Sequence, residues 1–554
     1  MSDYGWIETI TQLVGTALVG LVSYFVWCLY NARMEFYKLK KQGLPMPPWN
    51  PILGHLLILP KYLAQVPKGS QQSYMFGILS QLFPDSDGTY YIDLWPFSGP
   101  KIMTVSPQVA RQVCQELDLG KPAMIYPFFK PITGGHGIFT QNGAEWKASR
   151  ELFNPAFNAS EILHHTPRIV EHAQEFVGKL REHAKKGDVF SLDRLTCWYM
   201  MDVIGSVALD ARLNCLRGSP NVLAASMRNA LDNHMRDEEL NPFKRYSPMR
   251  PIREWNNSYK MDTYISAELD KKYQKWRTSS SPSKTKSIMD LAMADYMRGR
   301  TASQNLDTSF KTWACAQIRL FLFVGHDSTA AIIVYALYLL SKNPEALARI
   351  REEHSKVFGA NPTVAPELLL SKHHLINQLP YTTAVIKETL RLFPPAYGFR
   401  GAEPGSPITL RNPQAPAERW PIHDFGIWIL HDYIGRHPEY WVSRHEFLPE
   451  RWLVEPGHEL YPRDRDAWRP FEYGSRNCVG QTLVMLDIKI TLLMIVREFD
   501  VRDAYEEWDG VMGRRSGMQT FYDGERAFQV SKGSGHPVDG FPCRVEVRRA
   551  DGGA

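Results

Sequence analysis

The segment FEYGSRNCVG, residues 471–480, constrains the fold of this chain more than any other. It places one of only seven cysteines, Cys478, between two glycines, and a mostly apolar run, TLVMLDIKITLLMI, follows it. Gly474 and Gly480 allow the backbone to pass close to a bound group and to aim N–H groups at the sulfur. The apolar run is typical of a buried helix, whose positive N-terminal end would stabilise a thiolate. The alternative is a buried structural cysteine, the usual fate of a lone Cys.

A single thiolate in such a loop can hold haem iron, and its electron donation favours cleavage of an O–O bond. Phe471 can pack over the ligand, and Arg476 can pair with a haem propionate. The pattern F-x-x-G-x-R-x-C-x-G resembles the haem-binding loop of the cytochrome P450 family, in which the cysteine is the iron ligand. The resemblance implies that Cys478 binds the iron and that Phe471, Gly474, Arg476 and Gly480 belong to the haem-binding site.

Glu388 and Arg391, in KETLRLFPP, lie three residues apart on one helical face. Taken alone, they would be an ordinary surface ion pair. They resemble the E-x-x-R motif of the cytochrome P450 family, and FLPERW supplies Arg451 farther along the chain. The resemblance implies that these three residues form a buried charged cluster whose role is to support the haem loop.

The segment VGHDST, 324–329, resembles the family's oxygen-activating motif, [AG]-G-x-[DE]-T-[TS]. Its glycine leaves room for oxygen, and a hydroxyl beside an acid can relay protons. The resemblance assigns the acid to Asp327 and the hydroxyl to Ser328, with Thr329 as a second donor. The opening valine replaces Ala or Gly and is expected to crowd one haem edge, while the serine lacks the methyl group that stiffens threonine. The alternative is hydroxyl bonding to the previous helical turn.

The segment NGAEWKASRELFNPAF, 142–157, resembles the W-x-x-x-R helix of the family. Trp146 and Arg150 lie one turn apart on one face, and both can donate to a haem propionate. Arg400, five residues beyond Pro395, occupies another position that the family uses for a propionate. These three residues complete the expected cofactor-binding set.

Residues 10–30, ITQLVGTALVGLVSYFVWCLY, carry no charge and are long enough to cross a bilayer as a helix. Acidic residues precede this stretch, and Arg33, Lys38, Lys40 and Lys41 follow it, which predicts a lumenal tail and a cytosolic catalytic domain. A cleaved signal peptide is the alternative, but the sequence lacks a basic n-region and a small-residue cleavage site.

These features divide the chain into three parts. We expect a lumenal tail and transmembrane helix at 1–32, a basic and proline-rich linker at 33–55, and a catalytic domain at 56–554. The resulting protein would be a single-pass protein of the endoplasmic reticulum membrane.

Helical periodicity dominates the rest of the chain, and β-prone pieces occur at FGIWIL (425–430) and RVEVRR (544–549). The stretch 313–340 is apolar on most sides, which predicts a central helix buried by its neighbours. We therefore expect a mainly α fold with minor β: a single large haem-thiolate monooxygenase (cytochrome P450) fold preceded by one N-terminal transmembrane helix.

The resemblance implies haem b as cofactor and insertion of one oxygen atom from dioxygen, with two electrons from NADPH. No G-x-G-x-x-G loop opens a helix, so the electrons are expected from a separate NADPH-cytochrome P450 reductase, with cytochrome b5 as a further candidate partner. Lys147 and Arg469 are candidates for the basic face that meets the reductase. A net charge of +5 from 64 basic and 59 acidic residues is too even to suggest a nucleic acid partner.

The segments that contact substrate in the family hold mostly large apolar side chains here, which suit a bulky apolar substrate. These residues are Ile125, Tyr126, Phe128, Phe129, Phe321, Ala396, Tyr397, Met518 and Phe521. The general texture resembles fungal members of the family, many of which tailor polyketides or terpenoids in secondary metabolism.

Three other functions remain open. One is a non-redox haem-thiolate isomerase or dehydratase, against which the Asp327–Ser328 pair argues because such chemistry needs no proton relay. The second is a housekeeping or xenobiotic lipid hydroxylase, and the third is a haem-binding membrane protein without catalysis.

Overall fold

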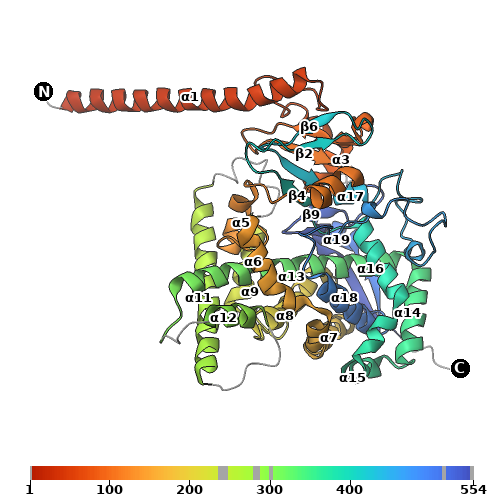
Figure 1. The fold of residues 1–554 in the computed structure, drawn as a ribbon. Coiled ribbons are helices and arrows are strands. Elements are labelled where there is room, and N and C mark those ends of the chain that lie inside the picture. Colours follow the sequence, from red (N-terminus) through yellow and green to blue (C-terminus); the bar gives the residue numbers. More distant parts are fainter. Residues whose placement is uncertain (1–2, 235–246, 279–286, 299–303, 514–519, 549–554) are drawn as a thin grey trace.

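A computed structural model describes residues 3–234, 247–278, 287–298, 304–513 and 520–548. Helices form most of this part of the chain, and short strands form small sheets beside them (Figure 1). The expected mainly helical fold with minor β is confirmed.

The centre of the molecule is the helix α13 (Thr308–Lys342), which crosses the middle of the body in Figure 1. Its side chains are apolar on most sides, and 83% of its most hydrophobic window is buried by protein. It packs mainly against α8 (Leu192–Leu209) and also against α5 (Ile125–Thr133) and α16 (Pro380–Leu392). Burial by neighbouring helices explains why a stretch hydrophobic enough to span a membrane is a core helix here.

The described residues form further α-helices besides α13, α8, α5 and α16. They are α1 (Asp3–Lys41), α2 (Leu59–Leu63), α3 (Gln72–Ser80), α4 (Pro107–Arg111), α6 (Gly143–Phe153), α7 (Ala159–Lys186), α9 (Val222–His234), α11 (Met249–Thr278), α12 (Ile288–Met297), α14 (Pro344–Phe358), α15 (Ala365–Ser371), α17 (His431–Ile434), α18 (Gln481–Ile495) and α19 (Tyr505–Val511).

The largest sheet has the strand order β1–β2–β7–β4, with β2 and β7 parallel and the other pairs antiparallel. Its strands are β1 (Tyr90–Ile92), β2 (Lys101–Thr104), β7 (Gly426–Ile429) and β4 (Gly398–Gly401). A second sheet joins β3 (Phe190–Ser191), β11 (Pro542–Val547) and β8 (Phe499–Asp503). Two hairpins pair β5 (Thr409–Arg411) with β6 (Arg419–Pro421) and β9 (Gln529–Ser531) with β10 (Gly535–Pro537). The two expected β-prone pieces form β7 and β11.

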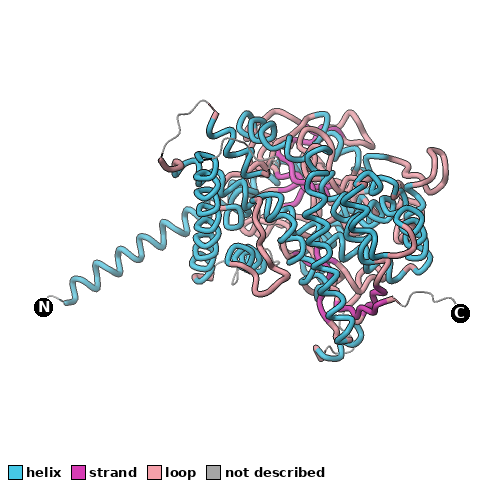
Figure 2. The backbone as a smooth tube through the Cα atoms, turned by 90° about the horizontal axis from the view of Figure 1, so that it is seen from below, coloured by secondary structure: helices cyan, strands magenta, loops and turns pink. Residues whose placement is uncertain are grey.

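The N-terminal helix α1 projects from the body in both views (Figures 1 and 2). Its apolar side chains between Ile10 and Tyr30 are exposed, which makes it a candidate membrane span. The helix does not end at residue 32 but continues to Lys41, and its last turns bury Phe36 and Leu39 against the catalytic domain. The start of the expected linker is therefore a packed helix rather than a free spacer.

The sequence predicts Arg33 to be one of the cytosolic charges that follow the membrane span, but the structure places it inside the protein. It is buried, forms an ion pair with Asp93 and donates to the carbonyl oxygens of Ile52 and Trp95. Its charge therefore fastens the helix to the domain, and the exposed basic side chains are those of the last turn, Lys38, Lys40 and Lys41.

Glu388, Arg391 and Arg451 form a fully buried charged cluster. Glu388 Oε1 lies 2.7 Å from Arg391 Nη2 and 2.9 Å from Arg451 Nε. Burial by itself raises the pKa of Glu388, but the two arginines outweigh it and hold that pKa below its ordinary value. Arg391 also donates to the carbonyl oxygens of residues 435, 444 and 446. The cluster therefore ties α16 to the segment that leads into the Cys478 loop.

Replacing Glu388 with Gln should destabilise the protein strongly, because it leaves two buried guanidinium groups without their shared anion. The expected loss in the free energy of unfolding is about 3–5 kcal/mol, measured by urea denaturation followed by circular dichroism.

The matched control is Glu352→Gln, which removes the exposed partner of Lys356 on α14. That change should cost less than about 1 kcal/mol. Equal losses for the two variants would contradict a supporting role for the buried cluster.

Candidate active site

An interior cavity of about 1010 Å³ lies between α13 and the Cys478 loop. Helix α5, the middle of α13, residues 395–400 and the loop 470–480 form much of its wall. The fold therefore brings together segments that are far apart in the sequence. Cys478 opens only toward this interior space, with α13 on the other side.

The environment of Cys478 suits a metal-bound thiolate. Its own N–H donates to the carbonyl oxygen of Phe471 at 2.8 Å, which closes the loop. Burial raises the pKa of the thiol, whereas the N–H groups of Gly480 and Gln481 and the charge of Arg150 lower it. Helix α18 begins at Gln481, so its positive end lies beside the sulfur, as the sequence predicted.

The two loop glycines differ in backbone conformation and in the space around them. Gly474 has a φ of +85°, and an added Cβ would lie 2.0 Å from the carbonyl oxygen of Cys114, so this residue is required for packing against Cys114. Gly480 has a φ of −85° and caps α18, with the nearest atoms to an added Cβ at 3.9 Å. Packing against Cys114 already requires a glycine at 474, and the expected close approach of this loop to a cofactor stays a prediction.

Basic side chains gather at one edge of the cavity. Arg400 is 2% exposed, and its Nη2 has no hydrogen-bond partner among the described residues. Arg476 stacks 4.3 Å from the ring centroid of Trp146 and donates to the carbonyl oxygen of Gln141. Arg150 also lines the cavity and donates to the backbone and side chain of Asn477.

Lys121 adds a cation to this edge that no motif indicated. Burial and then the charge of Arg400 lower the pKa of Lys121 well below its ordinary value, and the same two causes lower the pKa of Arg476 to about 10. Like charges that weaken one another in this way favour a bound anion. The two propionates of haem fit this edge, and the unpartnered guanidinium nitrogen of Arg400 fits the same group.

The three distal candidates lie on α13 and line the cavity. The Ser328 hydroxyl donates to the carbonyl oxygen of Val324 at 2.9 Å, which is the helix back-bonding that the sequence left as an alternative. The Thr329 hydroxyl is buried and has no hydrogen-bond partner among the described residues. Asp327 is buried and ion-paired with Arg228 of α9. Of the two distal hydroxyls, only that of Thr329 has no hydrogen-bond partner among the described residues.

Gly325 lines the cavity and also allows close helix packing. A Cβ added to it would lie 2.5 Å from the side chain of Ile204 on α8. The neighbouring Val324 is 40% exposed, toward the cavity. The expected crowding by valine and the expected room for oxygen at the glycine both remain predictions, and the contact between α8 and α13 is a further reason for the glycine.

Most of the expected substrate residues line the cavity, two do not, and one lies outside the described residues. Those that line it are Ile125, Phe128, Phe129, Phe321, Ala396 and Tyr397. The Tyr126 ring instead stacks on His136, with ring centroids 3.5 Å apart. Phe521 is 55% exposed and is not part of the wall, so its prediction is wrong. Met518 lies outside the described residues.

A polar cluster interrupts the apolar wall, and sequence patterns did not indicate it. His234 at the end of α9 and Glu254 on α11 lie 3.1 Å apart between Nδ1 and Oε1. Arg250 donates to the same carboxylate oxygen at 2.7 Å, and the His234 Nε2–H donates to the carbonyl oxygen of Phe128 at 2.5 Å. All three charged or titratable side chains line the cavity.

The structure separates the two candidates for a reductase-facing surface. Lys147 is exposed on α6. Arg469 is buried and pairs with Glu472 at 2.9 Å and with Asp466 at 3.4 Å. The proposal that Arg469 contributes to a docking face is therefore wrong, because its charge is neutralised inside the protein.

Known proteins are similar to this chain in sequence and in fold. The sequence profile of the family described as Cytochrome P450 matches residues 45–510. The chain is 37% identical to cytochrome P450 monooxygenase polC of Polytolypa hystricis, across 95% of this chain and 93% of that protein. It is 31% identical to cytochrome P450 monooxygenase acrF of Aspergillus aculeatus, across 88% and 99%. The heme domain of cytochrome P450DA has a TM-score of 0.70 at 18% identity, across 92% of this chain and 98% of that one, and shows the same fold.

Because these matches cover most of the chain, the general chemistry of the family applies to it. Members of the family hold haem through a cysteine thiolate and act as monooxygenases, which agrees with the cavity, its basic edge and the cysteine that lines it. The chain is therefore an oxidoreductase with a haem-thiolate cofactor, and it belongs to the cytochrome P450 family.

Proposed function

We propose that this protein uses two electrons from NADPH, delivered by a separate reductase, to insert one oxygen atom into a bulky, mainly apolar substrate. The observation that carries the proposal is that Cys478 and the hydroxyl residues of α13, Ser328 and Thr329, line one large cavity. A thiolate ligand and a hydroxyl that can pass on protons are the two side chains that dioxygen activation requires of the protein.

Each wall of the cavity has its own task in this proposal. Bound haem b supplies the activation of dioxygen. Cys478 holds the iron, and the N–H groups of Gly480 and Gln481 stabilise its negative charge. Arg400 and Arg476, with Lys121, hold the propionates and so fix the orientation of the haem plane. The apolar wall around Phe321 excludes water from the reacting side.

The distal residues manage protons. Asp327 stays ionised, because its cationic partners outweigh the effect of burial and hold its pKa well below the ordinary value. Ser328 can donate a proton into the cavity when its hydroxyl leaves the carbonyl oxygen of Val324, and the buried Thr329 hydroxyl, which has no hydrogen-bond partner among the described residues, is the second donor. A non-redox isomerase or dehydratase would need none of these groups, so their presence favours the monooxygenase.

The electron donor is proposed to be NADPH-cytochrome P450 reductase, with cytochrome b5 as a second donor. The exposed Lys147 can contribute to the docking face, and an ion-pair interface of this kind weakens as salt rises. Helix α1 would anchor the protein in the endoplasmic reticulum membrane with the catalytic domain in the cytosol. The exposed lysines that follow its apolar part, Lys38, Lys40 and Lys41, support that orientation.

The substrate class follows from the cavity wall. Large aromatic and aliphatic side chains suit a rigid polycyclic molecule, and the cluster of His234, Arg250 and Glu254 suits one polar group at its far end. A carboxylate acceptor beside a guanidinium donor fits a hydroxyl, which both donates and accepts. The fungal origin of the relatives polC and acrF supports a role in secondary metabolism, with terpenoids or polyketides as substrates. A housekeeping or xenobiotic lipid hydroxylase is the second candidate, favoured only by the size of the apolar cavity.

Replacing Cys478 with Ser should abolish thiolate ligation while leaving the loop intact, because the hydroxyl is nearly isosteric. The reduced, carbon-monoxide-bound variant should lose the red-shifted absorption band of thiolate-ligated haem, and substrate-dependent NADPH consumption with added reductase should fall at least about a thousandfold.

The matched control is Cys315→Ser, a buried cysteine of α13 whose sulfur lies 3.6 Å from the Ser266 hydroxyl. It should keep both the band and the activity. Retention of both in the Cys478 variant would disprove the proposed function.

Replacing Arg250 with Gln should weaken binding of substrates that carry the polar group. A polycyclic terpenoid alcohol should bind the unaltered protein about tenfold more tightly than its methyl ether, since a hydrogen bond to a charged group contributes about 1.5–3 kcal/mol. Optical titration of the haem band measures both affinities.

The Arg250 variant should bind the alcohol and the ether equally. The control is Arg253→Gln, an exposed residue of the same helix that is not part of the wall, which should keep the preference. An unchanged preference in the Arg250 variant would show that the polar cluster does not contact the substrate.

A further inference from the structure

Asp327 is held by groups from three elements outside its own helix. Arg228 Nη1 of α9 lies 2.8 Å from Asp327 Oδ1, and the N–H of Ser534 donates to Oδ2 at 2.6 Å. His536 Nε2 of β10 lies 3.2 Å from Oδ1. A Cβ added at Gly533, whose φ is +110°, would lie 2.5 Å from Oδ2, so the β9–β10 turn closes directly on this carboxylate.

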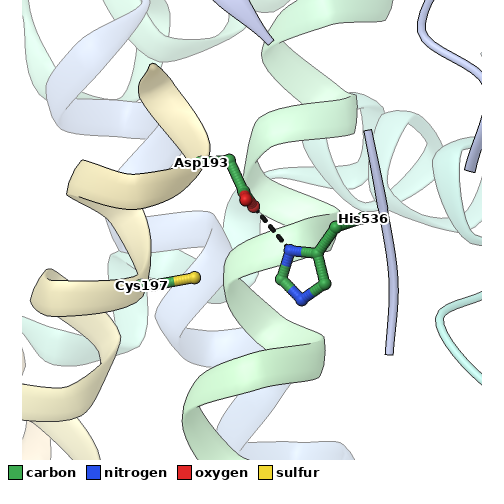
Figure 3. A group of neighbouring side chains, drawn as sticks. All are labelled: Asp193, Cys197 and His536. Carbon is green, nitrogen blue, oxygen red and sulfur yellow. Dashed lines mark hydrogen bonds and ion pairs between the residues drawn. The ribbon is translucent and has the colours of Figure 1, made fainter. Parts of the chain in front are cut away.

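His536 lies between two carboxylates. Its Nδ1 is 2.5 Å from Oδ1 of Asp193, which is in the first turn of α8, and Figure 3 shows the ring directed toward that residue. Its Nε2 lies 3.0 Å from the Ser534 hydroxyl as well as 3.2 Å from Asp327. Both ring nitrogens therefore have acceptors, which is the arrangement of a doubly protonated imidazole.

The charges of this network balance. Burial alone lowers the pKa of His536, but Asp193 and Asp327 outweigh it and raise that pKa to about 9. Two carboxylates thus meet two cations, His536 and Arg228, and Lys532 adds a more distant positive charge. Arg228 also pairs with Asp232, which is 42% exposed, at 3.4 Å. Cys197 and His326 also face the network and are neutral at pH 7, because burial raises the pKa of Cys197 and lowers that of His326 to about 4.

A bound metal ion is the other reading of Asp193, Cys197 and His536, whose ligand atoms lie within 4.8 Å of one another. The direct hydrogen bond between Asp193 and His536, drawn in Figure 3, occupies the atoms that an ion would need. Arg228 Nη1 also lies 3.8 Å from the Cys197 sulfur, and a guanidinium at that distance disfavours a cation. The network is therefore an ion-pair network.

We propose that His536 is a positioning residue for Asp327: braced by Asp193, it holds the Asp327 carboxylate in one orientation against the cavity wall. Because Gly533, Ser534 and Asp327 all line the cavity, the same contact fastens the β9–β10 turn over the distal side. The consequence for catalysis rests on the proposed proton-relay role of Asp327, but the contact itself does not. Loss of the His536 charge should release Asp327 and the turn together.

The first test measures the contact without turnover. A group whose pKa rises from 6.5 to about 9 on folding stabilises the fold fully below pH 6.5, and this contribution is lost as pH rises through 9. The melting temperature of the resting holoenzyme should exceed that of His536→Gln by several degrees at about pH 7, and the gap should narrow by about pH 9.5, because glutamine does not titrate.

The matched control is His354→Gln, a buried histidine of α14 whose Nε2 lies 2.8 Å from the Thr382 hydroxyl. Burial lowers the pKa of His354 to about 3, so it is neutral over this whole range. The difference in melting temperature between the unaltered holoenzyme and His354→Gln should stay constant with pH. A constant gap for the His536 variant would overturn the proposal, whatever the enzyme's activity.

The second test asks whether His536 acts through Asp327. With reductase and a turned-over substrate, the peroxide released per NADPH should rise severalfold in His536→Gln and in Asp327→Asn, and the double variant should release no more than Asp327→Asn alone. Additive increases would assign His536 a separate role and contradict the proposal. Absence of NADPH-dependent turnover in the unaltered protein would instead count against the proposed function, while the melting test still decides the contact.

Discussion

A sulfur anion held inside the protein is the condition on which the rest of this structure depends. Desolvation disfavours the thiolate of Cys478 and raises its pKa, and the fold partly offsets that cost with the N–H groups of Gly480 and Gln481, the start of α18 and the charge of Arg150. Each of these compensations requires the loop to keep one shape. The buried Glu388 cluster lies behind the chain that enters this loop, so the stability of the ion cluster and the chemistry of the sulfur are linked through the backbone.

Two groups of charged residues border the cavity, and they differ in whether their charges are balanced within the protein. On the basic edge, burial and the charge of Arg400 lower the pKa values of Lys121 and Arg476, and one guanidinium nitrogen of Arg400 has no hydrogen-bond partner among the described residues, which suits an anionic cofactor. On the distal side, Asp327 is matched by cations inside the protein, so its charge does not depend on any ligand. The first system would be completed by haem, whereas the second is complete in the protein itself.

Local patterns predicted what depends on neighbours in the chain. The Cys478 loop, the helix after it and the pair of Glu388 and Arg391 all follow from spacings of a few residues. The sequence could not show contacts between distant segments: Ser534 and Asp327 are 207 residues apart. The burial of Arg469 was missed for a different reason: its partners Glu472 and Asp466 are only three residues away, and their spacing does not show that the fold encloses this segment.

The most direct measurement of the central claim is X-ray absorption at the iron edge of the purified protein, compared between the unaltered chain and Cys478→Ser. The account predicts one sulfur atom in the first coordination shell of the unaltered protein and none in the variant, with the porphyrin nitrogens unchanged. A sulfur signal that persists in the variant, or that is absent from the unaltered protein, would contradict the assignment of Cys478 as the iron ligand.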